Sequence, residues 1–436
     1  MNKSRHINGL MLVFSIIGGI IGYIFGEAII NFYMYRIPNV LLVGMYFGVF
    51  GLCVLTMCLL AEKIKPRLTG VKWQSKDWKN ALIVIPLAAI LMFGTGCLTQ
   101  FIYGLNVKQV AAPPIDDYVF IIDDSGSMYG NDPQELRYSE VNKLIDELDD
   151  SKRVAYYLFS DTVTPVFDFQ YATAAGKEQM HAAIDNAYND GGGTDINGAL
   201  TMALEDVKSQ AIPGRSMALV LLSDGEDFFD TNPIIQECTK NNISVDCIGL
   251  GISMFSSGKI MNELADGTGG NYYDIQSADQ LVGVFTNIKR HIGNSRLLLA
   301  RRYGRERTTA IYGIERVIFI ALFGLLLGTA IGAMFDNKQL FKNLLLGGAV
   351  TGLLAGLAME LGMYAYLNTR FCRTLMDILL SIVVCIFTAA ISYEIKDEFA
   401  KPANQWDPTA MYGSQQVNQF GQSTTGNDYT GPIGRF

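Results

Sequence analysis

The sequence has few charged residues and only three histidines. Lys, Arg, Asp and Glu make up 17% of its 436 residues, against roughly 25% in an average soluble domain. The histidines are His6, His181 and His291, and neither a Ser–His–acid set nor a G-x-x-x-x-G-K-[ST] phosphate loop is evident. Without such groups binding is favoured over catalysis, and we expect the protein not to be an enzyme.

Cysteine occurs seven times but never as C-x-x-C, the spacing typical of zinc or redox motifs. Cys238 and Cys247 lie in the middle of the chain, and we favour two buried thiols there over a disulfide. The other five lie in or beside apolar runs, where we expect them to serve as small apolar residues: Cys53, Cys58, Cys97, Cys372 and Cys385.

The sequence is instead rich in long apolar runs. Half of the residues are hydrophobic, and each run is long enough to cross about 30 Å of hydrocarbon as a helix. The first run is too long for a signal peptide and lacks an A-x-A site, so we expect an anchor in a lipid bilayer. Six runs are present, at 8–33, 38–61, 80–103, 316–335, 344–367 and 374–395.

These runs divide the chain into five predicted parts. The last is rich in Gln, Asn, Gly, Ser and Thr and poor in aliphatic residues, so we expect it to be disordered. The parts are a transmembrane unit of three helices (1–110), a central domain (115–292), a basic connector (293–315), a second three-helix transmembrane unit (316–395) and the polar tail (396–436).

Glycines recur every four residues in the predicted helices. Such rows let another helix backbone approach closely, either within the chain, which we favour, or in a homo-oligomer or channel-like assembly. The spacing also suggests a 3+3 repeat, because Gly18 and Gly22 match Gly328 and Gly332 in offset. Gly44 and Gly48 match Gly348 and Gly352 in the same way. The rows are Gly18, Gly22 and Gly26; Gly324, Gly328 and Gly332; and Gly348, Gly352 and Gly356.

The central domain is acidic and alternates strands with helices. Residues 116–290 contain 29 Asp and Glu and 11 Lys and Arg, a net charge of −18. Because phosphate contacts need clustered Lys and Arg, we expect no nucleic-acid partner. The alternation predicts a doubly wound, Rossmann-like α/β domain. We expect strands at 118–123, 153–160, 165–169, 217–223 and 243–250, and helices at 177–188, 197–208, 234–241 and 278–290.

Oxygen donors follow three of these elements. Residues 123–128, D-D-S-G-S-M, end the first strand, where ligands of open α/β sheets bind. Thr194 lies in G-G-G-T-D, and Asp224 ends the central strand in S-D-G. Carboxylates and hydroxyls without His or Cys suit a hard cation such as Mg²⁺ or Mn²⁺, or alternatively Ca²⁺, and suit zinc poorly.

This order of loops resembles the von Willebrand factor A domain with its metal-ion-dependent adhesion site, over residues 115–290. The resemblance implies that domain type between two three-helix transmembrane groups, and a protein partner whose Asp or Glu fills an open position on the metal. An alternative is the same fold with a site that is never filled. The implied metal ligands are Asp123, Ser125, Ser127, Thr194 and Asp224.

Acidic neighbours of these residues leave two readings open. Asp124 and Asp195 either strengthen cation binding or are solvated loop residues, which we favour. Glu226, Asp227 and Asp230 form either a rim for the partner or a plain exposed loop.

Basic residues near the spans conflict over sidedness. Lys3, Arg5 and the basic loop 63–79 favour a cytoplasmic amino terminus, which puts the central domain outside and the tail inside. The arginines of 296–316 would favour the cytoplasm. We expect the outside placement because early helices usually dominate topology.

Two functions remain open. The leading one is a cell-membrane protein whose central domain binds a protein through a divalent cation, in adhesion, complex assembly or signalling. The alternative is a channel or transporter subunit regulated by that domain. Glu27, Glu360 and Asp377 lie inside apolar runs, where ionisable groups usually face a bundle interior.

Overall fold

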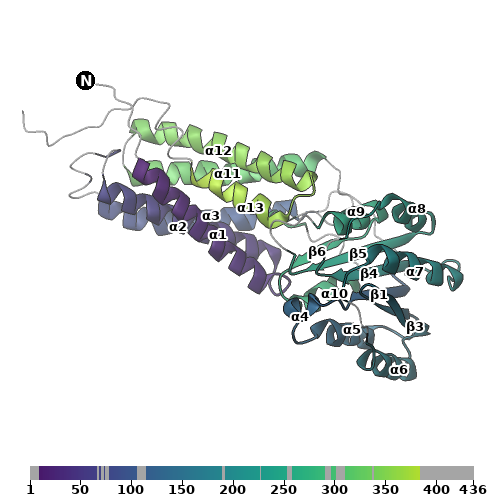
Figure 1. The fold of residues 1–436 in the computed structure, drawn as a ribbon. Helices are drawn as coiled ribbons and strands as arrows, with labels where there is room; N and C mark the ends of the chain where they lie inside the picture. Colours follow the sequence, from purple (N-terminus) through teal and green to yellow (C-terminus); the bar gives the residue numbers. More distant parts are fainter. Residues whose placement is uncertain are drawn as a thin grey trace, which may run out of the picture.

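The protein consists of a helical bundle with an α/β domain at one end (Figure 1). The computed structural model describes residues 9–65, 68–69, 73, 78–105, 114–188, 192–225, 227–252, 258–289, 296–300, 310–335 and 338–382. The predicted tail, 396–436, lies outside these residues.

The α/β domain is built on one sheet with the strand order β3-β2-β1-β4-β5-β6. All neighbouring strands are parallel except β2 and β3, which form the predicted hairpin. Strands β1, β2 and β4 are buried along their whole length, as expected at the centre of a parallel sheet. The strands are β1 (Asp117–Asp123), β2 (Arg153–Phe159), β3 (Val163–Tyr171), β4 (Met217–Ser223), β5 (Ile243–Leu250) and β6 (Tyr272–Ile275).

Helices cover both faces of this sheet. Helices α5, α6 and α10 pack with one face of the strands, and α7, α8 and α9 with the other (Figure 1). The predicted doubly wound α/β domain is therefore confirmed. The domain's helices are α4 (Met128–Asn131), α5 (Leu136–Glu147), α6 (Ala174–Asp185), α7 (Ile196–Ser209), α8 (Asn232–Lys240), α9 (Lys259–Thr268), η2 (Ala278–Gln280) and α10 (Leu281–Lys289).

Within the described part of the chain, five helices are long and apolar enough to span a membrane. They are α1 (Gly9–Tyr33), α2 (Asn39–Ile64), α3 (Trp78–Tyr103), α11 (Ala310–Met334) and α12 (Lys338–Tyr364). The described part of the predicted sixth run forms the short helix α13 (Thr369–Ser381), and the rest of that run lies outside the described residues. Helix α11 begins six residues before the predicted 316, because Arg316 is buried inside the bundle and does not mark a helix end.

Glycine rows pack against helices of the same chain. A Cβ built on Gly18 would lie 2.9 Å from the Cα of Val54 in α2. In the second unit a Cβ on Gly324 would lie 2.4 Å from the carbonyl oxygen of Gly348. A Cβ on Gly348 would likewise meet the backbone of Gly324. The favoured prediction of packing within the chain is therefore confirmed, and these rows are occupied without a second copy.

The predicted repeat holds for the first helices and fails for the second. Gly18 and Gly328 both face the following helix of their own unit. Gly44, however, faces Phe93 and Cys97 of α3, whereas its counterpart Gly348 faces α11. The two units therefore use equal glycine spacing for different contacts.

Charged side chains inside the bundle have partners. Arg373 of α13 makes two contacts with Glu27 of α1, one of 2.8 Å between Nη2 and Oε2. Arg316 lies 3.1 Å from Glu360, and the Tyr46 hydroxyl donates to Asp377 at 2.7 Å. All three carboxylates singled out from the sequence thus bind side chains of other helices, as groups removed from water require.

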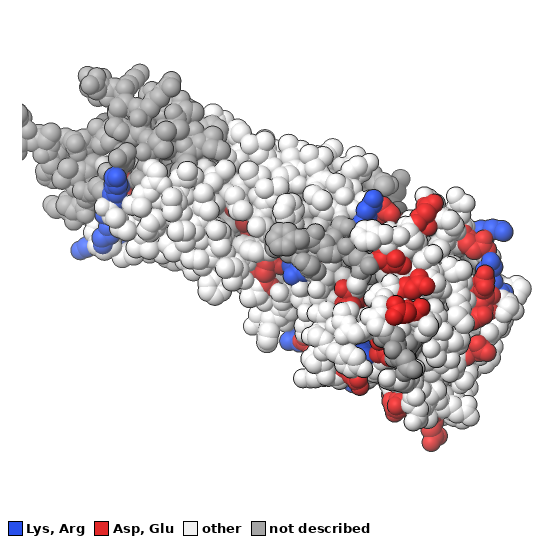
Figure 2. Space-filling model, viewed as in Figure 1, with Lys and Arg blue, Asp and Glu red and all other residues white. Residues whose placement is uncertain are grey.

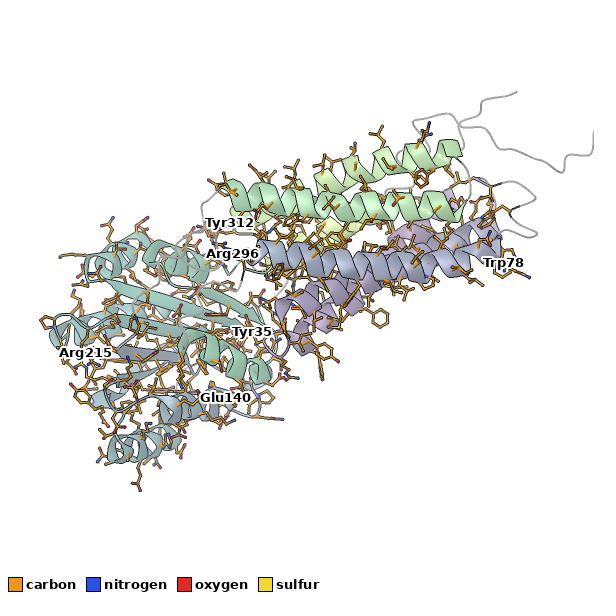
Figure 3. All side chains as sticks on the ribbon, turned by 180° about the vertical axis from the view of Figure 1, so that it is seen from behind. Tyr35, Trp78, Glu140, Arg215, Arg296 and Tyr312 are labelled. Carbon is orange, nitrogen blue, oxygen red and sulfur yellow. The ribbon has the colours of Figure 1, made fainter. Side chains whose placement is uncertain are left out.

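Part of the predicted basic connector lies inside the bundle. Residues 296–300 are 5% exposed or less. The carbonyl oxygen of Leu299 accepts from Arg373 at 2.9 Å, and that of Ala300 from Arg316 at 2.7 Å. The Arg296 guanidinium lies over the ring of Tyr312 at 3.6 Å (Figure 3). Arg296 and Arg316 are therefore both buried within the bundle.

Close helix packing predicts unequal effects of one added methyl group. Gly328→Ala should lower the melting temperature of the detergent-solubilised protein, because the new Cβ would lie 2.1 Å from the Leu344 carbonyl oxygen; overpacking of this kind costs about 1–3 kcal/mol. Gly94→Ala is the control, since nothing lies within 4 Å of its Cβ position. Equal melting temperatures for the two variants would contradict the packing described.

The pair between Arg373 and Glu27 makes a second prediction. Arg373→Met should destabilise the protein by about 3–5 kcal/mol, because it leaves the Glu27 carboxylate buried without its partner. Thermal unfolding in detergent measures the loss, and Glu27→Gln combined with Arg373→Met should restore much of it. A double variant no more stable than the single one would show that the charge of Glu27 is not the cause.

Candidate metal site at the ends of strands β1 and β4

The site starts where the two central strands end. Ile122 of β1 pairs with Leu222 of β4, so the next residues, Asp123 and Ser223, lie opposite each other. The Ser223 hydroxyl donates to Asp123 Oδ2 at 2.5 Å. This is the point where the crossovers diverge to either side of β1, the usual ligand position of such sheets.

Hydrogen bonds join four of the five predicted ligands. Asp123 Oδ1 accepts from the backbone N–H of Ser125 at 2.8 Å. The hydroxyls of Ser125 and Ser127 are 3.1 Å apart, and Ser127 donates to Asp224 Oδ1 at 2.8 Å. Two carboxylates and two hydroxyls therefore converge at one place.

Thr194, the fifth predicted ligand, lies beside this cluster. A Cβ built on Gly225 would be 3.2 Å from the Thr194 hydroxyl oxygen, so Thr194 borders the turn that carries Asp224. The next residue, Asp195, donates its backbone N–H to the Ser160 carbonyl at 2.8 Å, which ties this loop to the end of β2.

Burial of the site rises from its rim to its base. Ser127 is exposed and Asp224 half-buried, whereas Asp123 and Ser125 are buried. Burial raises the pKa of Asp123 to about 6, hydrogen bonds from Ser125 and Ser223 oppose the shift, and the nearby charge of Asp224 adds to it. A bound cation would offset the cost of burying the Asp123 carboxylate and its repulsion by Asp224. The side of the cation nearest the exposed rim would remain open to solvent.

The donors fit a hard cation. Among the described residues, no group of three or more His, Cys, Asp and Glu is placed to hold a metal. A cation at this site must therefore take hydroxyl oxygens beside the two carboxylates, a donor set typical of Mg²⁺ or Mn²⁺ sites.

Asp124 is not the solvated loop residue that we favoured, whereas Asp195 is exposed at the end of its loop. Asp124 is 9% exposed and accepts from Arg137 at 2.7 Å and Tyr138 at 2.5 Å. It is neither a solvated loop residue nor a free charge near the cation, because Arg137 neutralises it. Asp195 caps α7 by accepting from the Gly198 N–H at 2.8 Å.

Asn131 is a part of the site that the sequence analysis missed. Its side chain donates to Asp224 Oδ2 at 2.8 Å, opposite the oxygen that Ser127 binds. Ser127 and Asn131 are one helical turn apart across α4, a helix too short to predict from periodicity. Its position one helical turn after Ser127 is the only sequence signal that could have identified Asn131.

This edge of the sheet faces the helical bundle. Asn131 lies against Gly251, and the next residue, Ile252, accepts a hydrogen bond from Arg370 of α13. Arg215, which binds Asp117 at the start of β1, lies at the remote end of the domain (Figure 3). The candidate site is therefore on the side of the domain nearer the bundle.

Comparison with known proteins identifies the domain. Residues 117–287 match the family model of the von Willebrand factor type A domain. Human inter-alpha-trypsin inhibitor heavy chain H4 is 31% identical over 166 residues, which are 35% of this chain and 17% of that protein. The chain thus spans less than a fifth of this relative's length.

The chain is also similar to solved structures, at lower sequence identity. A von Willebrand factor type A structure from Catenulispora acidiphila is 22% identical, with a TM-score of 0.35, over 42% of this chain and 44% of that one. Mussel byssus proximal thread matrix protein 1, with a zinc-occupied MIDAS motif, is 18% identical, with a TM-score of 0.33, over 41% and 48%. Given the family match, the sheet order and the surrounding helices, residues 117–287 form a von Willebrand factor type A domain between apolar helices of membrane-spanning length.

Proposed function

We propose that this protein is a multi-pass membrane protein whose von Willebrand factor type A domain binds a protein partner through a divalent cation. The observation that supports it most is the hydrogen-bonded cluster of Asp123, Ser125, Ser127 and Asp224, open to solvent on one side. Such a module suits adhesion, complex assembly or signalling.

Each residue has a place in this proposal. Asp123 and Asp224 supply the negative charge, and Ser125, Ser127 and Thr194 supply neutral oxygens. Asn131 and Ser223 orient the two carboxylates through their hydrogen bonds. An Asp or Glu of the partner completes the coordination of Mg²⁺, with Mn²⁺ or Ca²⁺ as alternatives. The residues hold and expose the ion, and this supports binding without catalysis.

Contacts inside the bundle support anchoring over transport. Glu27 and Glu360 are held by Arg373 and Arg316, so their charges are already matched. Carboxylates that relay ions need freedom to exchange partners, whereas these tie α1 to α13 and α11 to α12.

Charge placement supports an extracytoplasmic domain. Lys63 and Lys65 end α2 at the far end of the bundle, where Figure 2 shows blue side chains remote from the red α/β domain. At the near end, Arg316 and Arg373 are paired internally and offer no free charge to a membrane surface. The conflict over sidedness weakens, because Arg316 of the 296–316 run is neutralised by Glu360.

A partner would meet the site close to the membrane. The Asp224–Asn131 hydrogen bond and the Ile252–Arg370 contact lie on the bundle side of the domain. The partner is therefore either a membrane protein or one held against the bilayer.

Removal of either carboxylate should abolish the metal response. We expect Mg²⁺ to raise the melting temperature of the full-length protein in detergent relative to EDTA, by several degrees at about 100 times its Kd, where binding adds about 2.7 kcal/mol. Asp123→Ala and Asp224→Ala should lose this shift. Asp195→Asn, which keeps the helix cap, should retain it, and a shift that survives both alanine variants would refute the assigned site.

Sidedness can be measured in intact cells with a membrane-impermeant maleimide. Gln134→Cys, on the exposed surface of the α/β domain, should be labelled above the wild-type baseline, whereas Lys65→Cys should react only after lysis. The reverse pattern would place the domain in the cytoplasm and leave the metal proposal untouched.

A further inference from the structure

A groove of about 500 Å³ opens beside the metal loops. We call it the Phe228 groove; its lining includes Ile196, Asp227, Phe228, Lys259, Met261 and Glu263. Ile196 and Met261 are buried and form its base, whereas Phe228 and Lys259 stand at its exposed rim.

The groove continues the metal site. Gly225, which also lines it, follows Asp224 directly, and Ile196 lies two residues after Thr194. An extended chain advances about 3.3–3.6 Å per residue. A partner whose carboxylate sits on the cation can therefore lay its adjacent residues into the groove.

The groove offers an uncovered apolar surface. Phe228 is 88% exposed, the most of any large apolar side chain among the described residues. Phe229 and Ile260 line the same groove and are only partly buried. A large aromatic group left in water next to a binding site is typical of an interaction surface.

The charge of the groove is negative. Of the described residues that line it, three are acidic (Asp227, Asp230 and Glu263) and one, Lys259, is basic. Lys259 lies 3.5 Å from Glu263. The surrounding domain is acidic as well, as the red side chains in Figure 2 show. A partner here must bring positive charge with its apolar group, because like charges would repel it.

We propose that the Phe228 groove selects a partner segment in which an Asp or Glu is followed or preceded closely by an apolar residue and by Lys or Arg. This rests on the proposed function, since the acidic residue of that segment is the one bound to the cation. The groove adds the specificity that a lone carboxylate lacks.

Peptide selection on the full-length protein in nanodiscs tests the groove. A random phage-displayed library with Mg²⁺ should yield peptides that carry an acidic residue with an apolar and a basic residue within about four positions. A synthetic peptide of the enriched sequence should bind about tenfold more weakly to Phe228→Ala, as for a buried aromatic contact. Asp230→Lys should weaken it severalfold, and Tyr171→Ala, exposed at the remote end of the domain beside Arg215, should leave it unchanged.

The outcomes separate the two proposals. Enriched peptides that need Mg²⁺ and Asp224 but share no flanking residues, and that bind Phe228→Ala like the wild type, overturn the groove and leave the metal function standing. Peptides that ignore EDTA, or no enriched peptide at all, overturn both. If Phe228→Ala alters only self-association, a second copy occupies the groove and the selection proposed here is wrong.

Discussion

The parallel pairing of β1 with β4 is the constraint on which the functional half of this protein depends. It sets Asp123 opposite Ser223, so the loops that leave the two strands start from one point. A shift of one residue in this register would turn Asp123 to the other face of the sheet. The apolar residues that pack the sheet and fix its register thereby fix the geometry of the candidate site.

The helical half is built on close approach and paired charge. Its glycines let helix backbones touch, which gives the bundle van der Waals contact where lipid offers no hydrophobic driving force. Arg316 and Arg373 then bind both a carboxylate and a carbonyl oxygen of residues 296–300. The chain segment that leaves the α/β domain is thus part of the bundle core, and the two halves are joined by more than a linker.

This junction fixes the orientation of the α/β domain relative to the bundle. The carboxyl ends of its parallel strands, with the candidate metal site and the Phe228 groove, lie on the side of the bundle, while their amino ends point away (Figure 3). In the membrane arrangement proposed above, this acidic surface would lie near the bilayer and would suit basic partners confined to the membrane, because confinement raises their local concentration.

The sequence by itself determined the fold class, the apolar helices and the cluster of oxygen donors. Strands 217–223 and 243–250 were predicted residue for residue, since buried apolar runs have clear ends. It could not place Asn131 on Asp224 or Arg137 on Asp124, nor find α5, α9 and β6, because these depend on contacts between distant segments. Helix α6 begins three residues before its predicted start because Thr173 caps it. Only the tertiary structure decided that Arg296 and Arg316 are buried, because a charge pattern does not say which partners will neutralise it.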